Sequence, residues 1–372
     1  MAATSNRQTT SALLLGVAGI AAFAVGASLA RQGATPRVPS CPDHVEPLAV
    51  QFERAREQGR GRQAPSPRHI PWRGWKDILY RTFVGITAHR LLALAASAVF
   101  FDILAVFPAI AALVSIYGLF ASGAQIRHHL VLLATIVPSA AIDILGNQID
   151  RISARSGGNL SVTFLLSLAI SIWSANAGIK AMFDALNVIY DEDEKRSFLR
   201  LNAISLLFTV GSLVFLLVAL AGVVAAPLIF AGFGVAHGGI MSIALLRWPI
   251  LFVIVAAALS LLYRFGPSRR PAKWRWVSVG SLVGTLTWLV GSAGFSWYLS
   301  HVADYNATYG SLGAALGFMT WLWLSAIVVL LSAQLNAEIE HRTARDSTVG
   351  SSERPIGQRH AVMADTVGAA QG

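Results

Sequence analysis

Residues 310–335 read GSLGAALGFMTWLWLSAIVVLLSAQL, a run without a charged side chain. A helix needs about 20 mostly apolar residues to cross a bilayer. Other long apolar runs precede this one, at 11–30, 91–121, 160–179, 203–230, 241–263 and 276–299. The sequence therefore predicts an all-α, polytopic transmembrane helix bundle, with a six-helix core and one additional N-terminal hydrophobic helix. A shorter apolar stretch at 130–145, split by Pro138, is typical of an interfacial or re-entrant segment.

The overall composition agrees with a membrane protein. Of the 372 residues, 55% are hydrophobic and only 13% are charged, and the mean hydropathy is +0.58. Soluble domains carry about 25% charged residues, so too little charge is present to coat a soluble protein of this length. Disordered, collagen-like, coiled-coil and disulfide-rich classes are excluded on the same numbers. Cys41 is the only cysteine, which excludes an internal disulfide.

The basic residues alternate between dense and sparse segments. Eleven lie in 31–90 and five in 264–275, whereas 231–240 and 300–309 contain none. Because Lys and Arg accumulate in cytoplasmic loops, this pattern predicts that both ends of the six-helix block face the cytoplasm. The net charge of +10 is thus explained by topology, and no nucleic-acid partner is expected.

Four regions are expected along the chain. Residues 1–32 form an N-terminal membrane anchor, 33–74 a flexible basic cytoplasmic linker, 75–342 the six-helix membrane domain, and 343–372 a disordered cytoplasmic tail. Ser28-Leu29-Ala30 resembles a signal-peptidase site, which leaves cleavage of the first 30 residues as an alternative. Cleavage would deliver the basic segment 31–90 to the outside, so an uncleaved anchor is favoured.

Four motifs carry a resemblance to a known family. They are LLALAASAVFFDILAVFPAIAALVSIYGLF at 91–120, ALNVIYDEDEKRSFLR at 185–200, YNATYGSLG at 305–313 and LLSAQLNAEIE at 330–340. In this order they resemble the YihY/virulence factor BrkB family of bacterial inner-membrane proteins, over roughly residues 75–342. The chain departs from the family pattern at Phe101, where tyrosine is frequent, and at Ala105, where serine is common.

The resemblance implies a six-helix, multi-pass protein of the bacterial inner membrane. It implies no reaction, because the family has no settled activity. A former assignment of some members as ribonuclease BN is regarded as mistaken. The resemblance therefore supplies an architecture and a location.

Asp102 is the first candidate functional residue. It lies about eleven residues into its apolar run, near mid-bilayer, where a carboxylate costs about 2.5–3.5 kcal/mol. Pro108 follows six residues later and is expected to kink the helix and free a backbone carbonyl. One interpretation is a proton or cation site on a transport path. The alternative is a buried carboxyl group that ties two helices together.

A second set of polar residues recurs at helical spacing: Asn176, Lys180, Asp184 and Asn187. Spacings of four, four and three place all of them on one helix face. They predict a polar wall at a cytoplasmic vestibule, or else a helix that becomes amphipathic as it leaves the lipid. Gln334 and Glu338 form a similar i,i+4 pair on the last helix, which either lines an exit or anchors the helix at the headgroups.

Enzyme motifs are missing from the sequence. It contains no G-x-x-x-x-G-K-[ST], H-E-x-x-H, G-x-S-x-G or G-x-G-x-x-G motif before a helix, and its histidines are scattered. The sequence therefore predicts neither a catalytic residue nor a metal or cofactor. Gly280-x-x-x-Gly284 and Gly313-x-x-x-Gly317 favour close helix packing, more often within one chain than in a homo-oligomer.

Three functions follow as hypotheses. The first is transport or export of a small amphipathic solute or lipid along a polar pathway through the helices. The second is a non-catalytic scaffold for envelope integrity or for serum or stress resistance. The third and most remote is a membrane-tethered ribonuclease, which would need clustered acidic metal ligands. In every case the partners expected are the bilayer and, for transport, an unidentified small molecule or lipid.

Overall fold

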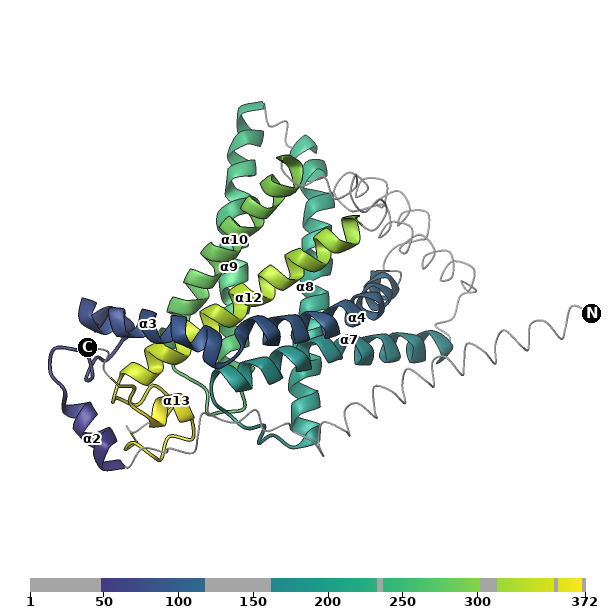
Figure 1. Ribbon diagram of the computed structural model, residues 1–372. Helices are drawn as coiled ribbons and strands as arrows, with labels where there is room; N and C mark the ends of the chain where they lie inside the picture. Colours follow the sequence, from purple (N-terminus) through teal and green to yellow (C-terminus); the bar gives the residue numbers. More distant parts are fainter. Residues whose placement is uncertain (1–47, 118–161, 233–236, 302–312, 351–353, 370–372) are drawn as a thin grey trace, which may run out of the picture. The chain divides into compact units, whose positions relative to one another are not determined.

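The computed structural model describes residues 48–117, 162–232, 237–301, 313–350 and 354–369 (Figure 1). The chain divides into two compact units, Met1–Val45 and Glu46–Gly372, and the described residues belong to the second. The predicted N-terminal helix at 11–30, Cys41 and the stretch at 130–145 lie outside the described residues.

Long helices follow the six apolar runs of the predicted core. They are α4 (Leu91–Tyr117), α7 (Val162–Ile189), α8 (Phe198–Gly232), α9 (His237–Phe265), α10 (Trp274–His301) and α12 (Gly313–Arg342). Over the described ranges no β-strand forms, and the extended backbone contributes one isolated bridge, between Ala272 and Thr348. The predicted all-α fold class is confirmed.

Within the residues that the structure describes, three segments are long and apolar enough to cross a bilayer: Phe198–Leu217, Trp274–Leu299 and Ala315–Arg342. A fourth is made by α3 (Trp72–Ala88) and the first part of α4 if that bent pair is counted as one span. The apolar part of α9, Leu251–Phe265, is shorter. That all six helices of the core cross the membrane stays a prediction.

A sharp bend separates α3 from α4. The two helix axes differ by 61° across a break at His89 and Arg90. Arg90 has a positive φ of 49°, a left-handed conformation that does not continue a helix. Pro108, by contrast, lies inside α4, which continues to Tyr117. The kink predicted at Pro108 stays a prediction.

The helices pack most extensively as α4 along α7, and as α10 along both α9 and α12. Leu186, Tyr263 and Leu330, from three of these helices, are completely buried in the main apolar core. Close approach of α10 to α12 depends on glycine. A Cβ at Gly280 would lie 2.5 Å from the Asn336 side chain, and one at Gly284 2.5 Å from Ser332. The first glycine motif therefore serves packing within the chain.

The structure differs from the sequence prediction in the segments that flank the membrane domain. Part of the predicted flexible linker forms α2 (Leu48–Arg56) and a 3₁₀ turn at Pro67–His69. The predicted disordered tail includes the short helix α13 (Val362–Asp365) and buries side chains such as Ser347 and Val367. Besides hydrogen bonds within the tail, residues from distant parts of the chain supply partners that local composition does not reveal. The Val367 N–H donates to Gln51, and the Gly368 N–H donates to the carbonyl of His341.

Candidate functional site

Asp102 lies between α4 and α7. Its carboxylate faces Gly178, where an added Cβ would come within 2.5 Å of Oδ1. Only glycine allows the α7 backbone to approach the carboxylate this closely. Asp102 is half-buried, and no described side chain or backbone group forms a hydrogen bond or ion pair with it. This carboxyl group is therefore available to a proton, a cation or a polar solute.

Asn176 and Lys180 face α8 instead. Thr209 Oγ1 donates to Asn176 Oδ1 at 3.0 Å, and Lys180 Nζ donates to Asn202 Oδ1 at 2.6 Å. The Lys180 ammonium also lies 5.2 Å from the ring centroid of Trp173, a cation–π distance. Asn176 is fully buried, yet its Nδ2 has no hydrogen-bond acceptor among the described residues.

The structure does not combine Asp102 with these two residues in one site. Gly178, which faces Asp102, is two positions from Asn176 and two from Lys180. Two residues correspond to about 200° around an α-helix. Asp102 therefore lies across α7 from the Asn176–Lys180 face, and the predicted polar pathway is divided between two faces of α7.

The remaining α7 candidates differ in exposure. Asp184 is exposed. Asn187 is buried, where its Oδ1 accepts from the Ser268 N–H at 2.7 Å and its Nδ2 donates to Glu194 at 3.1 Å. Asn187 thus ties the end of α7 to the turn that follows it and to the α9–α10 loop.

Gln334 and Glu338 belong to a network with α3. His89 Nδ1 is 2.8 Å from Gln334 Oε1, and Gln334 Nε2 donates to Glu338 Oε1 at 3.3 Å. Arg81 Nε donates to Glu338 Oε2 at 2.6 Å, and both side chains are about nine-tenths buried. Their partners are thus provided from within the protein, as expected of residues that hold α3 against α12.

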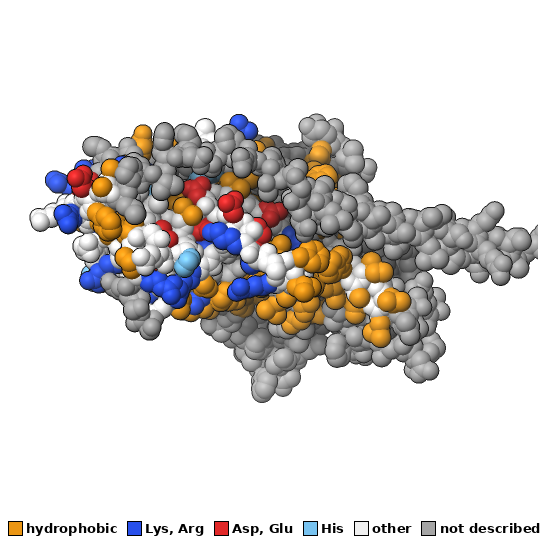
Figure 2. All heavy atoms as spheres, turned by 90° about the horizontal axis from the view of Figure 1, so that it is seen from below, with side chains coloured by type: hydrophobic (Ala, Val, Ile, Leu, Met, Phe, Trp, Pro, Cys, Tyr) orange, Lys and Arg blue, Asp and Glu red, His pale blue; other side chains and the backbone are white. Residues whose placement is uncertain are grey.

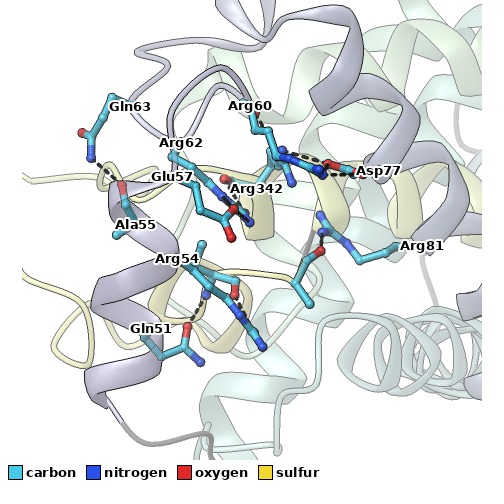
Figure 3. A network of polar contacts seen from close by, with 12 residues as sticks. Gln51, Arg54, Ala55, Glu57, Arg60, Arg62, Gln63, Asp77, Arg81 and Arg342 are labelled. Atoms are coloured by element: carbon cyan, nitrogen blue, oxygen red, sulfur yellow. Dashed lines mark hydrogen bonds and ion pairs between the residues drawn. The ribbon is translucent and has the colours of Figure 1, made fainter. Parts of the chain in front are cut away.

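The same end of α12 carries further buried polar residues, which the sequence did not single out as a site. Glu340 accepts two hydrogen bonds from Arg269, Arg342 pairs with Asp77 at 2.9 Å, and Asn336 bonds the backbone of α10. Figure 3 shows how Arg60 and Arg342 approach Asp77 from different segments. The alternation of polar and apolar residues at 334–342 could have indicated these residues from the sequence alone. Their partners could not be inferred, because they lie up to hundreds of residues away.

Burial and neighbouring charges shift the pKa of groups in the loops at this end. Burial alone would lower the pKa of Arg269, but the Glu340 carboxylate outweighs it and raises that pKa above its usual range. Burial raises the pKa of Glu192 despite bonds from Lys195 and a backbone N–H. For Glu194, burial is outweighed by hydrogen bonds from Arg196, so its pKa is lowered. The ionised form of Glu194 is thus stabilised in the fold, whereas that of Glu192 is destabilised.

Across the described part of the chain, no group of three His, Cys, Asp or Glu side chains is placed to hold a metal ion. Figure 2 shows Lys and Arg side chains gathered at one end of the face in view, with hydrophobic side chains beyond them.

The model of the family described as "Virulence factor BrkB" matches residues 82–356. The chain is 31% identical over 210 residues to the "Putative ribonuclease-like protein YfkH" of Bacillus subtilis, which covers 55% of this chain and 74% of that protein.

Two further relatives are named only as membrane proteins. A UPF0761 membrane protein of Nitrosospira multiformis is 27% identical over 71% of this chain and 61% of its own length. Another, from Pseudoalteromonas atlantica, is 26% identical over 72% of this chain and 88% of its own length. No solved structure matches the chain.

Proposed function

This chain belongs to the virulence factor BrkB family of membrane proteins, and we propose that it transports or exports a small amphipathic solute or a lipid. The family supplies no reaction, and the ribonuclease-like name belongs to one relative. The proposal therefore depends on the polar groups within the helices.

The observation that carries the proposal is Asp102. An ionisable residue within an apolar helix is costly and is commonly retained for a role in ion or solute movement. Asp102 has no described protein partner that would offset this cost, and Gly178 leaves room for its carboxylate. We propose that it binds the coupling proton or cation, or a cationic group of the solute.

Asn176 gives a second, separate support. Its buried Nδ2 lacks an acceptor among the residues described, and an unsatisfied buried donor costs about 1–3 kcal/mol. A polar group of a passing solute would supply that acceptor. Lys180 and exposed Asp184 continue the polar face of α7 toward its end.

A specific observation also favours the second candidate function, a non-catalytic scaffold. Gln334 and Glu338 are bonded within the protein, and the tail is bonded to α2, α3 and the turn after α7. A fixed surface at this end of the bundle is suited to holding a partner in place. We rank it second because it leaves Asp102 without a role.

The test compares metabolites and lipids inside and outside cells of a deletion strain that carries the wild-type gene, Asp102→Asn or Asp193→Asn. Asp193 is an exposed acid in the turn after α7 and controls for the loss of one charge. We expect one compound to accumulate in the deletion and to be cleared by wild type and Asp193→Asn but not by Asp102→Asn. Matching profiles for all strains would remove the support for transport.

The cellular location of the protein and its orientation in the membrane are part of the same proposal. We propose the bacterial inner membrane, with both ends of the six-helix block, the segment before α3 and the tail in the cytoplasm. Cys41 is the only cysteine, so an impermeant maleimide reports its side of the membrane. Labelling in intact spheroplasts would contradict this orientation, and labelling only after permeabilisation would support it.

A further inference from the structure

Helix α3 has two chemically different faces. Its inner face is buried and includes Gly74, Ile78 and Gly85. Its outer face exposes large apolar side chains: Trp72 67%, Leu79 50%, Tyr80 54%, Phe83 73% and Val84 46%. These positions recur at helical spacing, so they form one continuous stripe. A stripe of this kind is rarely left in water.

The packing of α3 places it at one end of the spans. Ile78 shares an apolar cluster with Trp276 near the start of α10 and with Leu335 and Ile339 near the end of α12. The α12 helix has 30 residues, which corresponds to about 45 Å, whereas the hydrocarbon core of a bilayer is about 30 Å thick. The last turns of α12, which contact α3, therefore reach the headgroup level if α12 crosses the bilayer.

The bend at His89 and Arg90 sets the direction of α3. Its axis makes an angle of 61° with that of α4. Membrane-spanning helices are tilted by about 20° on average. If α4 enters the bilayer at such a tilt, α3 cannot continue along the same direction, and it is turned toward the membrane plane.

The charges on α3 are also segregated. Asp77, its sole acidic residue, is buried and paired with Arg60 and Arg342. Arg73 and Lys76 are exposed on the same face as the apolar residues, near its N-terminal end. The outer surface of α3 thus combines an apolar stripe with uncompensated positive charge at its N-terminal end. This combination is complementary to anionic lipid headgroups above acyl chains.

We propose that α3 is an interfacial helix that lies on the bilayer surface, with its Trp72–Phe83 stripe in the headgroup–acyl boundary and Arg73 and Lys76 on the phosphates of anionic lipids. The inference does not depend on whether the protein transports a solute. In this arrangement α3 sets the depth in the bilayer of the bundle end at which Arg81 pairs with Glu338.

The first test measures depth. In a Cys41→Ser background, the full chain carries a fluorophore on a single cysteine, either Phe83→Cys or Leu286→Cys. Leu286 is an exposed residue in the middle of α10. Each labelled protein is reconstituted in phosphatidylcholine–phosphatidylglycerol vesicles. Lipids carry a quencher either near the headgroup or deep in the acyl chain. We expect the shallow quencher to act about twofold more strongly than the deep one at position 83, and the reverse at 286.

Two outcomes would overturn the proposal. Deep quenching at position 83 equal to that at 286 would make α3 part of a span. Absence of quenching at 83 by either lipid would place α3 in water or under another protein. Because Phe83 is an exposed position, the cysteine variant is expected to fold, and quenching at 286 reports correct insertion in the same preparation.

The second test measures lipid preference. Binding of spin-labelled phosphatidylglycerol and phosphatidylcholine is measured for wild type, for Arg73→Gln/Lys76→Gln and for Arg56→Gln/Arg345→Gln. The last variant is the control, because it removes the same charge from exposed positions outside α3. Each basic residue near an anionic surface contributes several-fold to binding, so the preference for phosphatidylglycerol should fall at least about twofold in the first variant alone. Equal preferences for all three proteins would contradict headgroup binding by Arg73 and Lys76.

Discussion

Arg269 and Glu340 form a buried ion pair with two hydrogen bonds, each 2.8 Å long, and neither side chain is exposed. Arg269 lies in the loop between α9 and α10, and Glu340 lies in the last turn of α12. Ser347 donates a third hydrogen bond to Glu340, and the Arg269 guanidinium lies 4.1 Å from the ring centroid of Tyr190. The pair therefore joins the end of α12 to the α9–α10 loop, to the residue that follows α7 and to the tail.

Loss of one partner of this pair should destabilise the protein strongly. Arg269→Gln or Glu340→Gln leaves a charge buried without its counterion, which costs about 3–5 kcal/mol. The free energy of unfolding, measured by denaturant or heat in detergent, should fall by that amount. Arg275→Gln, at an exposed position in the same region, should change it by less than about 0.5 kcal/mol.

The double variant Arg269→Gln/Glu340→Gln tests the pairwise nature of the effect. Because neither charge is then left alone, it should be more stable than the sum of the single losses predicts. Strict additivity of the two losses would contradict a direct coupling between the residues.

Gly178 should not tolerate a side chain. In Gly178→Ala the new methyl group would meet the Asp102 carboxylate at 2.5 Å, so α4 and α7 must separate or Asp102 must turn. Such overpacking costs about 1–3 kcal/mol. Gly211→Ala is the matched control, because nothing lies within 4 Å of its Cβ and alanine favours the helix by about 0.5–1 kcal/mol. Thermal unfolding should therefore shift in opposite directions, and equal shifts would argue against close packing at Gly178.

The tail should be ordered in solution. Val367 is completely buried, whereas Val362 is 37% exposed. Val367→Asn places a polar group in the apolar contact with α2, so amide exchange over residues 354–369 should accelerate by at least about tenfold. Val362→Asn makes the same chemical change at the surface and should leave exchange nearly as in wild type. Fast exchange of this segment in the wild-type protein would support the disordered tail that the sequence predicts.

The acids of the turn after α7 should give opposite pH dependences. The lowered pKa of Glu194 means that its ionised form stabilises the fold at pH values above 4.5, the pKa of an unperturbed Glu, and that this stabilisation is lost as the pH falls. The raised pKa of Glu192 means that its ionisation costs stability, a cost that appears as the pH rises above 4.5.

Unfolding temperatures between pH 4 and 8 test both signs. The advantage of wild type over Glu194→Gln should grow as the pH rises and then level off. Relative to Glu192→Gln, wild type should lose stability over the same rise. Parallel curves for the two variants would contradict the different environments of the two carboxylates.

The site was only partly predictable from the sequence. Asp102, Asn176 and Lys180 could be selected because polar residues are rare within apolar runs. That Asp102 and Asn176 lie across α7 from one another depends on which neighbour each face meets. Equally, spacing alone left open whether Gln334 and Glu338 line an exit or anchor a helix. Their contacts with His89 and Arg81 join α12 to α3, and the choice between an exit and a headgroup anchor stays a prediction.

The sequence by itself determined that this is a helical membrane protein and where its long helices lie, because apolar runs of bilayer length are a local property. Only the tertiary structure decided which polar and charged groups meet. Arg81 and Glu338 are 257 residues apart, and Gln51 and Val367 are 316 apart. Such pairs depend on the packing of whole helices. The sequence pattern around one partner of a buried ion pair does not reveal the other partner. For the same reason composition predicted a disordered tail, whereas partners elsewhere in the chain order it.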